Sequence, residues 1–176
     1  MHQSDSIAEL EPLYRLIHNG SESAPPPVYQ AVATLAGGGD KVTAAVAESA
    51  VVDQTVTWNV LALTKTRLIA VTVSGDKAHL TSDCKGDIDY EIDASVRPLA
   101  SIRHLRVADH KWSYMDARSK WHWEIRWEIV LEDGGVLAVP DLASSTFVAF
   151  RTKGNEFVEQ LLAVVDSHQL PGQVGS

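Results

Sequence analysis

Aromatic and basic side chains gather in one stretch of the chain, within residues 109–121: Trp112, Tyr114, Arg118, Lys120 and Trp121. Tryptophan and arginine often supply most of the binding energy where proteins meet. An aromatic and basic tip of this kind also suits contact with a membrane surface. We expect the stretch to be a partner-binding loop. The alternative is that its tryptophans pack beneath their own long hairpin.

A row of acids is the second group with possible chemistry: Asp87, Asp89, Glu91 and Asp93. Carboxylates are ligands for hard cations such as calcium, provided that they converge on one ion. Alternate residues on a flat strand lie about 7 Å apart, which is too far for that. We therefore expect a solvated strand face, with Arg103 or Arg106 as ion-pair partners, and no metal site.

Other reactive residues lack the spacing that catalysis or metal binding requires. His104, His110 and His122 fall near one predicted hairpin, but the chain has no H-x-x-x-H or H-E-x-x-H motif. No nucleophile elbow and no phosphate-binding loop is present, and the single cysteine, Cys84, has an acid beside it. Gly37-Gly38-Gly39 precedes a predicted strand and reads as a turn. We expect no enzymatic activity and no cofactor.

The composition limits where this protein works. Its net charge of -8 disfavours nucleic acid and strong binding to anionic membranes. One cysteine in 176 residues suits a reducing cytoplasm. The N-terminus shows no signal peptide, and no apolar run approaches the roughly 20 residues that span a bilayer.

Two helices are expected before the first strand. Ser6 and Glu9 form a capping box for a helix that ends near Ile17, followed by the proline-rich linker Ser21–Pro27. We assign residues 1–27 to this N-terminal extension. A second helix is expected to begin at Pro27 and to stop at the three glycines.

Seven consecutive strands follow in the sequence pattern. The clearest are the hairpin of 57–64 and 67–74, the alternating strand 87–94 and the Trp-rich strand 121–132 with its Asp133-Gly134-Gly135 turn. Further strands are expected within 41–52, 101–108 and 136–139. The segment Phe147–Phe150 fits either a strand or a helix start. Asn155 is expected to cap an amphipathic helix reaching about Ser167, before a disordered tail at 169–176.

These elements predict a mainly β, α+β protein. Seven antiparallel strands, each with one polar face, favour a closed or nearly closed barrel or two packed sheets. The final helix has one apolar stripe that suits an open end of a barrel. We assign residues 28–168 to this domain.

Several short motifs resemble those of bacterial pleckstrin-homology-like domains, including the GRAM-like group. Leu61–Ile69 is similar to their "LT-x-x-RL" hairpin, and Leu35–Val42 to the helix, turn and first strand before it. Val96–Ile102, Glu128–Val139 and Phe157–Leu162 are similar to their "IPL-x-x-I" segment, last hairpin and capping helix. The resemblance implies a seven-stranded bent barrel capped by the C-terminal helix, with a binding role and no catalysis.

The first hairpin departs from the lipid-binding members of that family. It reads Ser49-Ala50-Val51-Val52-Asp53-Gln54-Thr55, with an acid and no base, whereas phosphate recognition needs Lys and Arg donors. We therefore expect a protein or peptide partner, with lipid as a lesser candidate. The alternative function is a small-molecule carrier with a cavity lined by Trp58, Trp123 and Trp127. Sheet edges also offer surfaces through which a homo-oligomer can form.

Overall fold

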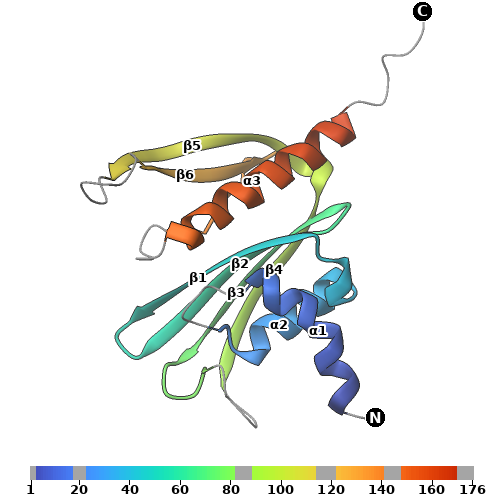
Figure 1. The fold of residues 1–176 in the computed structure, drawn as a ribbon, viewed down its shortest axis with the longest axis vertical. Helices are drawn as coiled ribbons and strands as arrows, with labels where there is room; N and C mark the ends of the chain where they lie inside the picture. Colours follow the sequence, from blue (N-terminus) through green and yellow to red (C-terminus); the bar gives the residue numbers. More distant parts are fainter. Residues whose placement is uncertain (1–2, 18–22, 82–88, 114–121, 141–147, 170–176) are drawn as a thin grey trace, which may run out of the picture. The chain divides into compact units, whose positions relative to one another are not determined.

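The computed structural model describes residues 3–17, 23–81, 89–113, 122–140 and 148–169, and the disordered tail expected at 169–176 lies outside them apart from Gln169. The described chain divides into two compact units, residues 1–98 and 99–176. Both are rich in antiparallel strands, as expected for a mainly β protein with three α-helices (Figure 1). Each unit has its own sheet.

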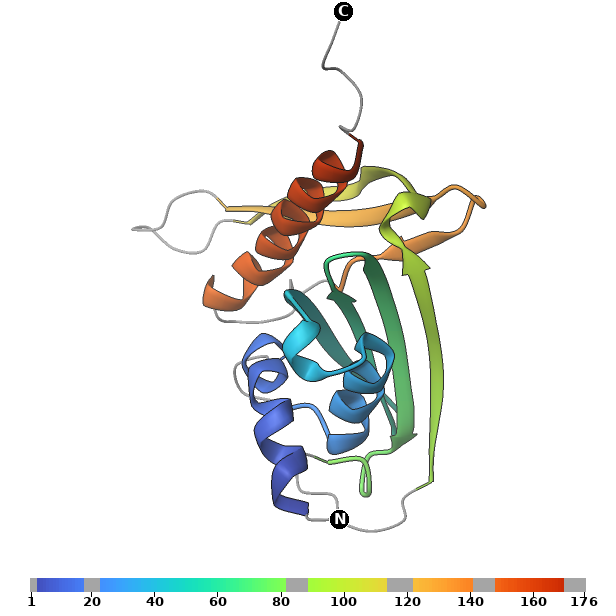
Figure 2. The ribbon, with the colours of Figure 1, turned by 90° about the vertical axis from the view of Figure 1, so that its right-hand side faces the viewer.

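The described part of unit 1 contains two α-helices, a short 3-10 helix and four strands. Their bounds are α1 Gln3–Ile17, α2 Pro26–Ala36, η1 Gly39–Lys41, β1 Ala44–Val52, β2 Thr55–Leu63, β3 Arg67–Asp76 and β4 Tyr90–Pro98. The strands form a meander in which each pairs with its sequence neighbour, in the order β1-β2-β3-β4. Both helices lie against one face of this sheet (Figure 2).

The helix α1 belongs to the core of unit 1, although the sequence predicted it as an extension ahead of the domain. Its Leu13 and Ile17 are fully buried in the same cluster as Trp58 on β2 and Val71 on β3. Pro12 lies inside the helix, where it removes one backbone donor. The apolar stripe of α1 therefore covers sheet surface that α2 alone leaves open.

The helix α2 follows the sequence closely. It begins at Pro26, where proline costs no hydrogen bond, and ends at Gly37 in the left-handed conformation with φ 77°. The Gly37 and Gly38 amides donate to the carbonyl oxygens of Thr34 and Ala33. Such a C-cap requires a residue without a Cβ penalty, which explains the glycine run.

Tyr29 of α2 is the largest side chain that is fully buried in unit 1. Its ring stacks on Tyr14 of α1, with 4.2 Å between the centroids. Burial raises the pKa of Tyr29 to about 12; the neighbouring Tyr14 adds to the rise, and the backbone of Ala24 opposes it. The hydroxyl lies near Ala24 but forms no hydrogen bond of ordinary geometry within the described residues.

The opposite face of the unit 1 sheet carries a polar row across three strands. The hydroxyl of Thr72 on β3 donates to Asn59 Oδ1 on β2 at 3.0 Å, and the Asn59 amide donates to Glu48 Oε1 on β1 at 3.4 Å. The register places these three residues directly opposite one another. Trp58 and Asn59, adjacent in sequence, therefore point to opposite faces, as strand alternation requires.

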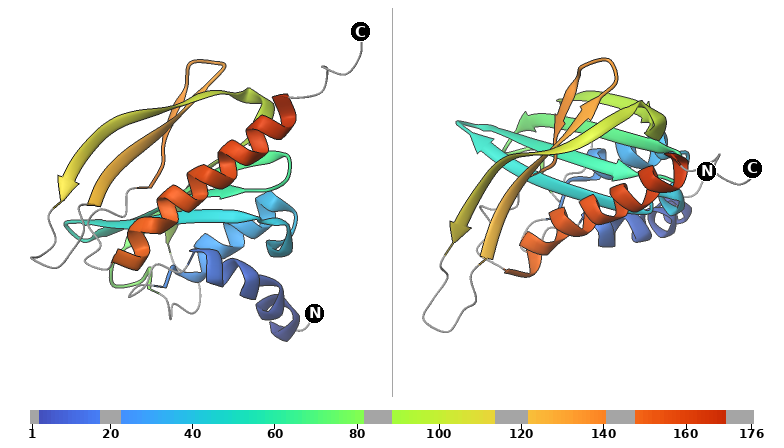
Figure 3. Two further views of the ribbon diagram at one scale, coloured as in Figure 1. Left: turned by 45° about the horizontal axis from the view of Figure 1, so that its top comes forward. Right: turned by 90° about the horizontal axis from the view of Figure 1, so that it is seen from above.

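Unit 2 contains the remaining strands and the C-terminal helix. Their bounds are η2 Leu99–Ser101, β5 Ile102–Ser113, β6 His122–Leu131, β7 Val136–Ala138 and α3 Val148–Gln169. The sheet order is β5-β6-β7, and the β6–β7 turn uses Gly134 with φ 83°, as the sequence predicts. The helix α3 runs along the β5–β6 hairpin (Figure 3).

The C-terminal helix begins earlier than predicted. Phe150 lies within α3, which settles the open assignment in favour of a helix, while residues 141–147 fall outside the described part. Asn155 is an interior residue of this helix instead of its cap. Its side-chain oxygen accepts a hydrogen bond from the indole N–H of Trp127 at 3.4 Å, so it joins α3 to β6.

The described strands do not close into one hydrogen-bonded barrel. They divide into a four-stranded and a three-stranded sheet, in line with the two-sheet arrangement that seven such strands also allow. The chain passes from β4 to β5 through η2, whose Leu99 is buried. The mainly β class, the antiparallel pairing and the terminal helix agree with the sequence.

Candidate functional site

The aromatic and basic stretch expected as a loop is only partly described. Trp112 lies on β5, and its backbone pairs with that of Trp123 on β6. Tyr114, Arg118, Lys120 and Trp121 fall in residues 114–121, outside the described part of the chain. The prediction that residues 109–113 belong to the loop is wrong, because β5 continues through Ser113.

The strand β5 is longer than predicted because its pairing with β6 continues past two irregularities in the register. Shifts occur between Ile102 and His104 and between Val107 and Asp109, and pairing resumes after each one. An irregularity of this kind changes which residues face each other but does not end a strand. The polar run after Ala108 resembles a loop because the second shift breaks the simple alternation there.

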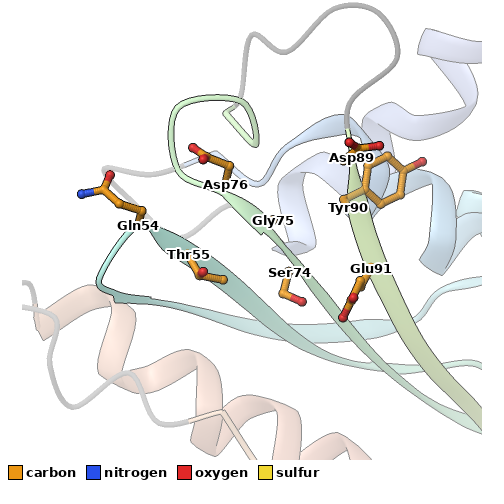
Figure 4. Close-up of a pocket in the computed structure, with 8 residues that line it drawn as sticks. All are labelled: Gln54, Thr55, Ser74, Gly75, Asp76, Asp89, Tyr90 and Glu91. Carbon is orange, nitrogen blue, oxygen red and sulfur yellow. The ribbon is translucent and has the colours of Figure 1, made fainter.

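One described pocket lies at the end of the unit 1 sheet where β4 begins (Figure 4). It has a volume of about 550 Å³ and is lined from the β1–β2 turn, the end of β3 and the start of β4. Its lining residues are Gln54, Thr55, Ser74, Gly75, Asp76, Asp89, Tyr90 and Glu91. The register pairs Ser74 with Glu91 and Thr55 with Asp76 across neighbouring strands.

Gly75 is what allows the strands to approach so closely at this pocket. A Cβ at this position would lie 3.2 Å from the Asp89 carbonyl oxygen and 3.4 Å from atoms of Leu80 and Tyr90. Tyr90 lies opposite Gly75, an arrangement in which an aromatic residue covers the gap that glycine leaves in a strand pair. Asp76 fixes the following turn by accepting the Ala78 amide at 2.7 Å.

The charged residues that the structure describes in this pocket are all acidic. Three carboxylates line it, those of Asp76, Asp89 and Glu91, and among the described residues no Lys, Arg or His side chain lines it. The described residues include no set of three or more His, Cys, Asp or Glu side chains arranged to hold a metal ion. Carboxylates, hydroxyls and the Gln54 amide can instead accept hydrogen bonds from a guanidinium or ammonium group.

The strand β4 leads away from the pocket along the edge of the sheet. It is the last strand in the order β1-β2-β3-β4, and no other described strand pairs with it beyond β3. Its apolar residues Tyr90, Ile92 and Val96 are 38%, 47% and 37% exposed. They share a face with the helix-covered residues Ile69 and Val73 of β3.

The sequence predicted β4 as a half-buried strand. The predicted alternation of acidic and apolar residues between its two faces is correct, but the prediction that the apolar face is buried is wrong. The helices α1 and α2 pack mainly against β1, β2 and β3, so the apolar side of β4 extends past their cover. The pattern Ile-Asp-Ala alone cannot reveal how far a helix reaches across a sheet. The presence of Pro98 at the strand end was the one sequence signal of an edge.

Comparisons with protein-family models, with curated proteins and with solved structures found no match to this chain. Among the described helices, none combines the length and the apolar character needed to cross a membrane.

Proposed function

We propose that this chain is a non-catalytic, pleckstrin-homology-like binding module that binds an extended basic segment of a partner protein along β4. The grouping of four and three antiparallel strands followed by a C-terminal helix supports the family assignment. The observation that carries the binding role is the exposed apolar side of β4 at a sheet edge. Proteins usually cover or charge such an edge, because its free backbone groups invite another strand.

The acidic residues on and beside β4 favour a basic partner segment. Glu91 and Asp93 alternate with Ile92 along the strand, and the acidic pocket lies at its beginning. Two copies of β4 that paired in parallel and in register would bring these carboxylates together, which disfavours a homodimer of that kind. A segment that alternates apolar and basic residues instead satisfies both faces, with one basic side chain entering the pocket.

The aromatic stretch of residues 109–121 remains a second proposed contact surface. Trp112 lies on β5, and binding residues often lie next to regular elements of this kind. This surface and β4 belong to different units, so separate variants test them.

The carrier alternative receives less support. It requires Trp58 to line an open cavity, but Trp58 is 4% exposed and packs in the core between the unit 1 sheet and its helices. A side chain that is packed in this way is not available to a ligand.

The test uses two labelled peptides of about seven residues, one alternating lysine with valine and one alternating glutamate with valine. Fluorescence anisotropy at low salt measures the affinity of the full chain for each. The lysine peptide is expected to bind and the glutamate peptide is not. Ile92→Ser should weaken binding about ten-fold, because one exposed apolar contact of this kind contributes about 1–2 kcal/mol.

The matched control is Val52→Ser at the opposite edge of the same sheet, where Val52 is 69% exposed. It removes a similar apolar side chain and should leave the affinity unchanged. Equal binding of both peptides, or equal effects of the two variants, would show that β4 is not the binding edge.

A further inference from the structure

A second pocket of unit 1 lies at the other end of the sheet, where α2 ends and β2 turns into β3. Its volume is about 610 Å³. The lining residues are Ala36, Gly37, Asp40, Lys41, Thr43, Thr64, Lys65, Thr66 and Arg67. The nine residues of β2 separate it from the acidic pocket, a distance of about 30 Å.

Hydrogen bonds fix the backbone that carries the basic residues of this pocket. Thr64 is buried, its amide donates to the Arg67 carbonyl at 2.9 Å, and its hydroxyl oxygen accepts the Arg67 amide at 3.1 Å. Two hydrogen bonds between Thr64 and Arg67 therefore fix the turn that contains Lys65. On the facing segment, the Lys41 Nζ lies 3.8 Å from where a Cβ on Gly37 would stand.

The positive charge that lines this pocket exceeds the negative charge beside it. The carbonyl end of α2 is equivalent to roughly half a negative charge, and Asp40 adds one more. Three cations, Lys41, Lys65 and Arg67, line the same pocket. Among the described residues, none of these three side chains takes part in an ion pair. The excess is notable in a chain of net charge -8.

We infer that this pocket binds a compact oxyanion with two or more charges, such as a phosphate group. Lysine and arginine donate charge-assisted hydrogen bonds to phosphate oxygens, and the Thr66 hydroxyl at the same turn adds a neutral donor. Three cations drawn from two segments of the chain match a multiply charged group better than a single carboxylate. The inference is independent of the proposed function, which concerns the opposite end of the sheet.

Isothermal titration calorimetry with inorganic pyrophosphate at low salt tests the inference. The wild-type chain is expected to bind, and Lys65→Gln and Arg67→Gln are each expected to weaken binding about ten-fold, the loss of one charge-assisted contact. The matched control is Lys77→Gln. It removes the same charge from an exposed lysine at the acidic end of the sheet and should change the affinity less than about two-fold. Circular dichroism melting confirms that each variant is folded.

Equal losses for Lys65→Gln and Lys77→Gln would mean that only net charge matters, and they would overturn the site. The absence of pyrophosphate binding at millimolar concentration would overturn it as well. Sedimentation with vesicles that contain phosphatidic acid separates two sources of the phosphate. Pyrophosphate binding with the protein left in the supernatant supports a soluble ligand. Co-sedimentation that is lost in Lys65→Gln supports a lipid headgroup at the same cations.

Discussion

At the scale of single residues, Tyr29 is the most unusual group that the structure describes. Its hydroxyl is buried and has no hydrogen bond of ordinary geometry to any described residue, and burial raises its pKa to about 12. Leaving a buried hydroxyl unpaired costs free energy, so the ring and not the hydroxyl stabilises this position. The stack with Tyr14 and the packing beneath α1 need only the aromatic ring.

The first prediction concerns Tyr29→Phe and pH. The folded chain holds the Tyr29 proton more tightly than the unfolded chain, whose tyrosine pKa is about 10. The resulting stability is complete below pH 10 and is lost as pH rises from about 10 to about 12, by on the order of 2 kcal/mol. Urea titrations at pH 8 and pH 11.5 should show a steeper loss for wild type than for Tyr29→Phe. Parallel losses in the two proteins would contradict this account of Tyr29.

Trp127 and Glu128 test the two faces of β6. Trp127 is partly buried and bonded to Asn155, so Trp127→Ala should destabilise by roughly 2–3 kcal/mol, below the value for a fully buried aromatic. Glu128 pairs with the largely exposed Arg106 at 2.6 Å, and Glu128→Ala should cost less than about 1 kcal/mol. Denaturant titration measures both. Equal costs would mean that the faces of β6 are reversed.

At the scale of elements, the proposed aromatic contact surface of residues 109–121 includes Trp112 on β5. The double variant Trp112→Ala with Arg118→Ala is expected to abolish capture of a protein partner from cell extract while the melting temperature stays within a few degrees. Pull-down with mass spectrometry measures capture, and a thermal melt measures folding. An unfolded double variant would instead mean that Trp112 is part of the hairpin's packing.

The sequence predicted elements well where local chemistry decides them. Proline at the start of α2, glycine at its end and the Asp133-Gly134-Gly135 turn all have the expected role. The sequence prediction failed where contacts between strands determine the end of an element. The strand β5 continues past Ala108 because it resumes pairing with β6 after an irregularity. The exposure of β4 and the two pockets could not be predicted, because they depend on how far α1 and α2 reach and on which turns meet.

At the scale of the whole molecule, charge is the dominant property. The net charge of -8 is spread unevenly, because three bases meet at one end of the unit 1 sheet and three acids at the other. Long-range attraction to an anionic surface depends on the summed charge, whereas a small anion responds to the local group. The chain is therefore expected to prefer soluble anions to anionic bilayers.

Binding to phosphoinositide vesicles should accordingly be weak. Liposome sedimentation at low salt, with and without phosphoinositides, measures it. Little protein is expected in the pellet in either case, because a negative chain is repelled by an anionic surface. Salt-sensitive pelleting at micromolar lipid would contradict this prediction and give the protein a membrane role.

The meander of unit 1 also sets the order in which its strands assemble. Only Asp53 and Gln54 separate β1 from β2, and a turn of three residues separates β2 from β3, so both closures lose little chain entropy. The closure from Asp76 to Tyr90 is much longer. The first three strands, aligned by Glu48, Asn59 and Thr72, should therefore form early, and β4 should join last and detach first. Among the four strands of unit 1, amide hydrogen exchange is expected to be fastest along β4. The strand that is proposed to receive a partner is therefore also the strand of this sheet that opens at the lowest free-energy cost.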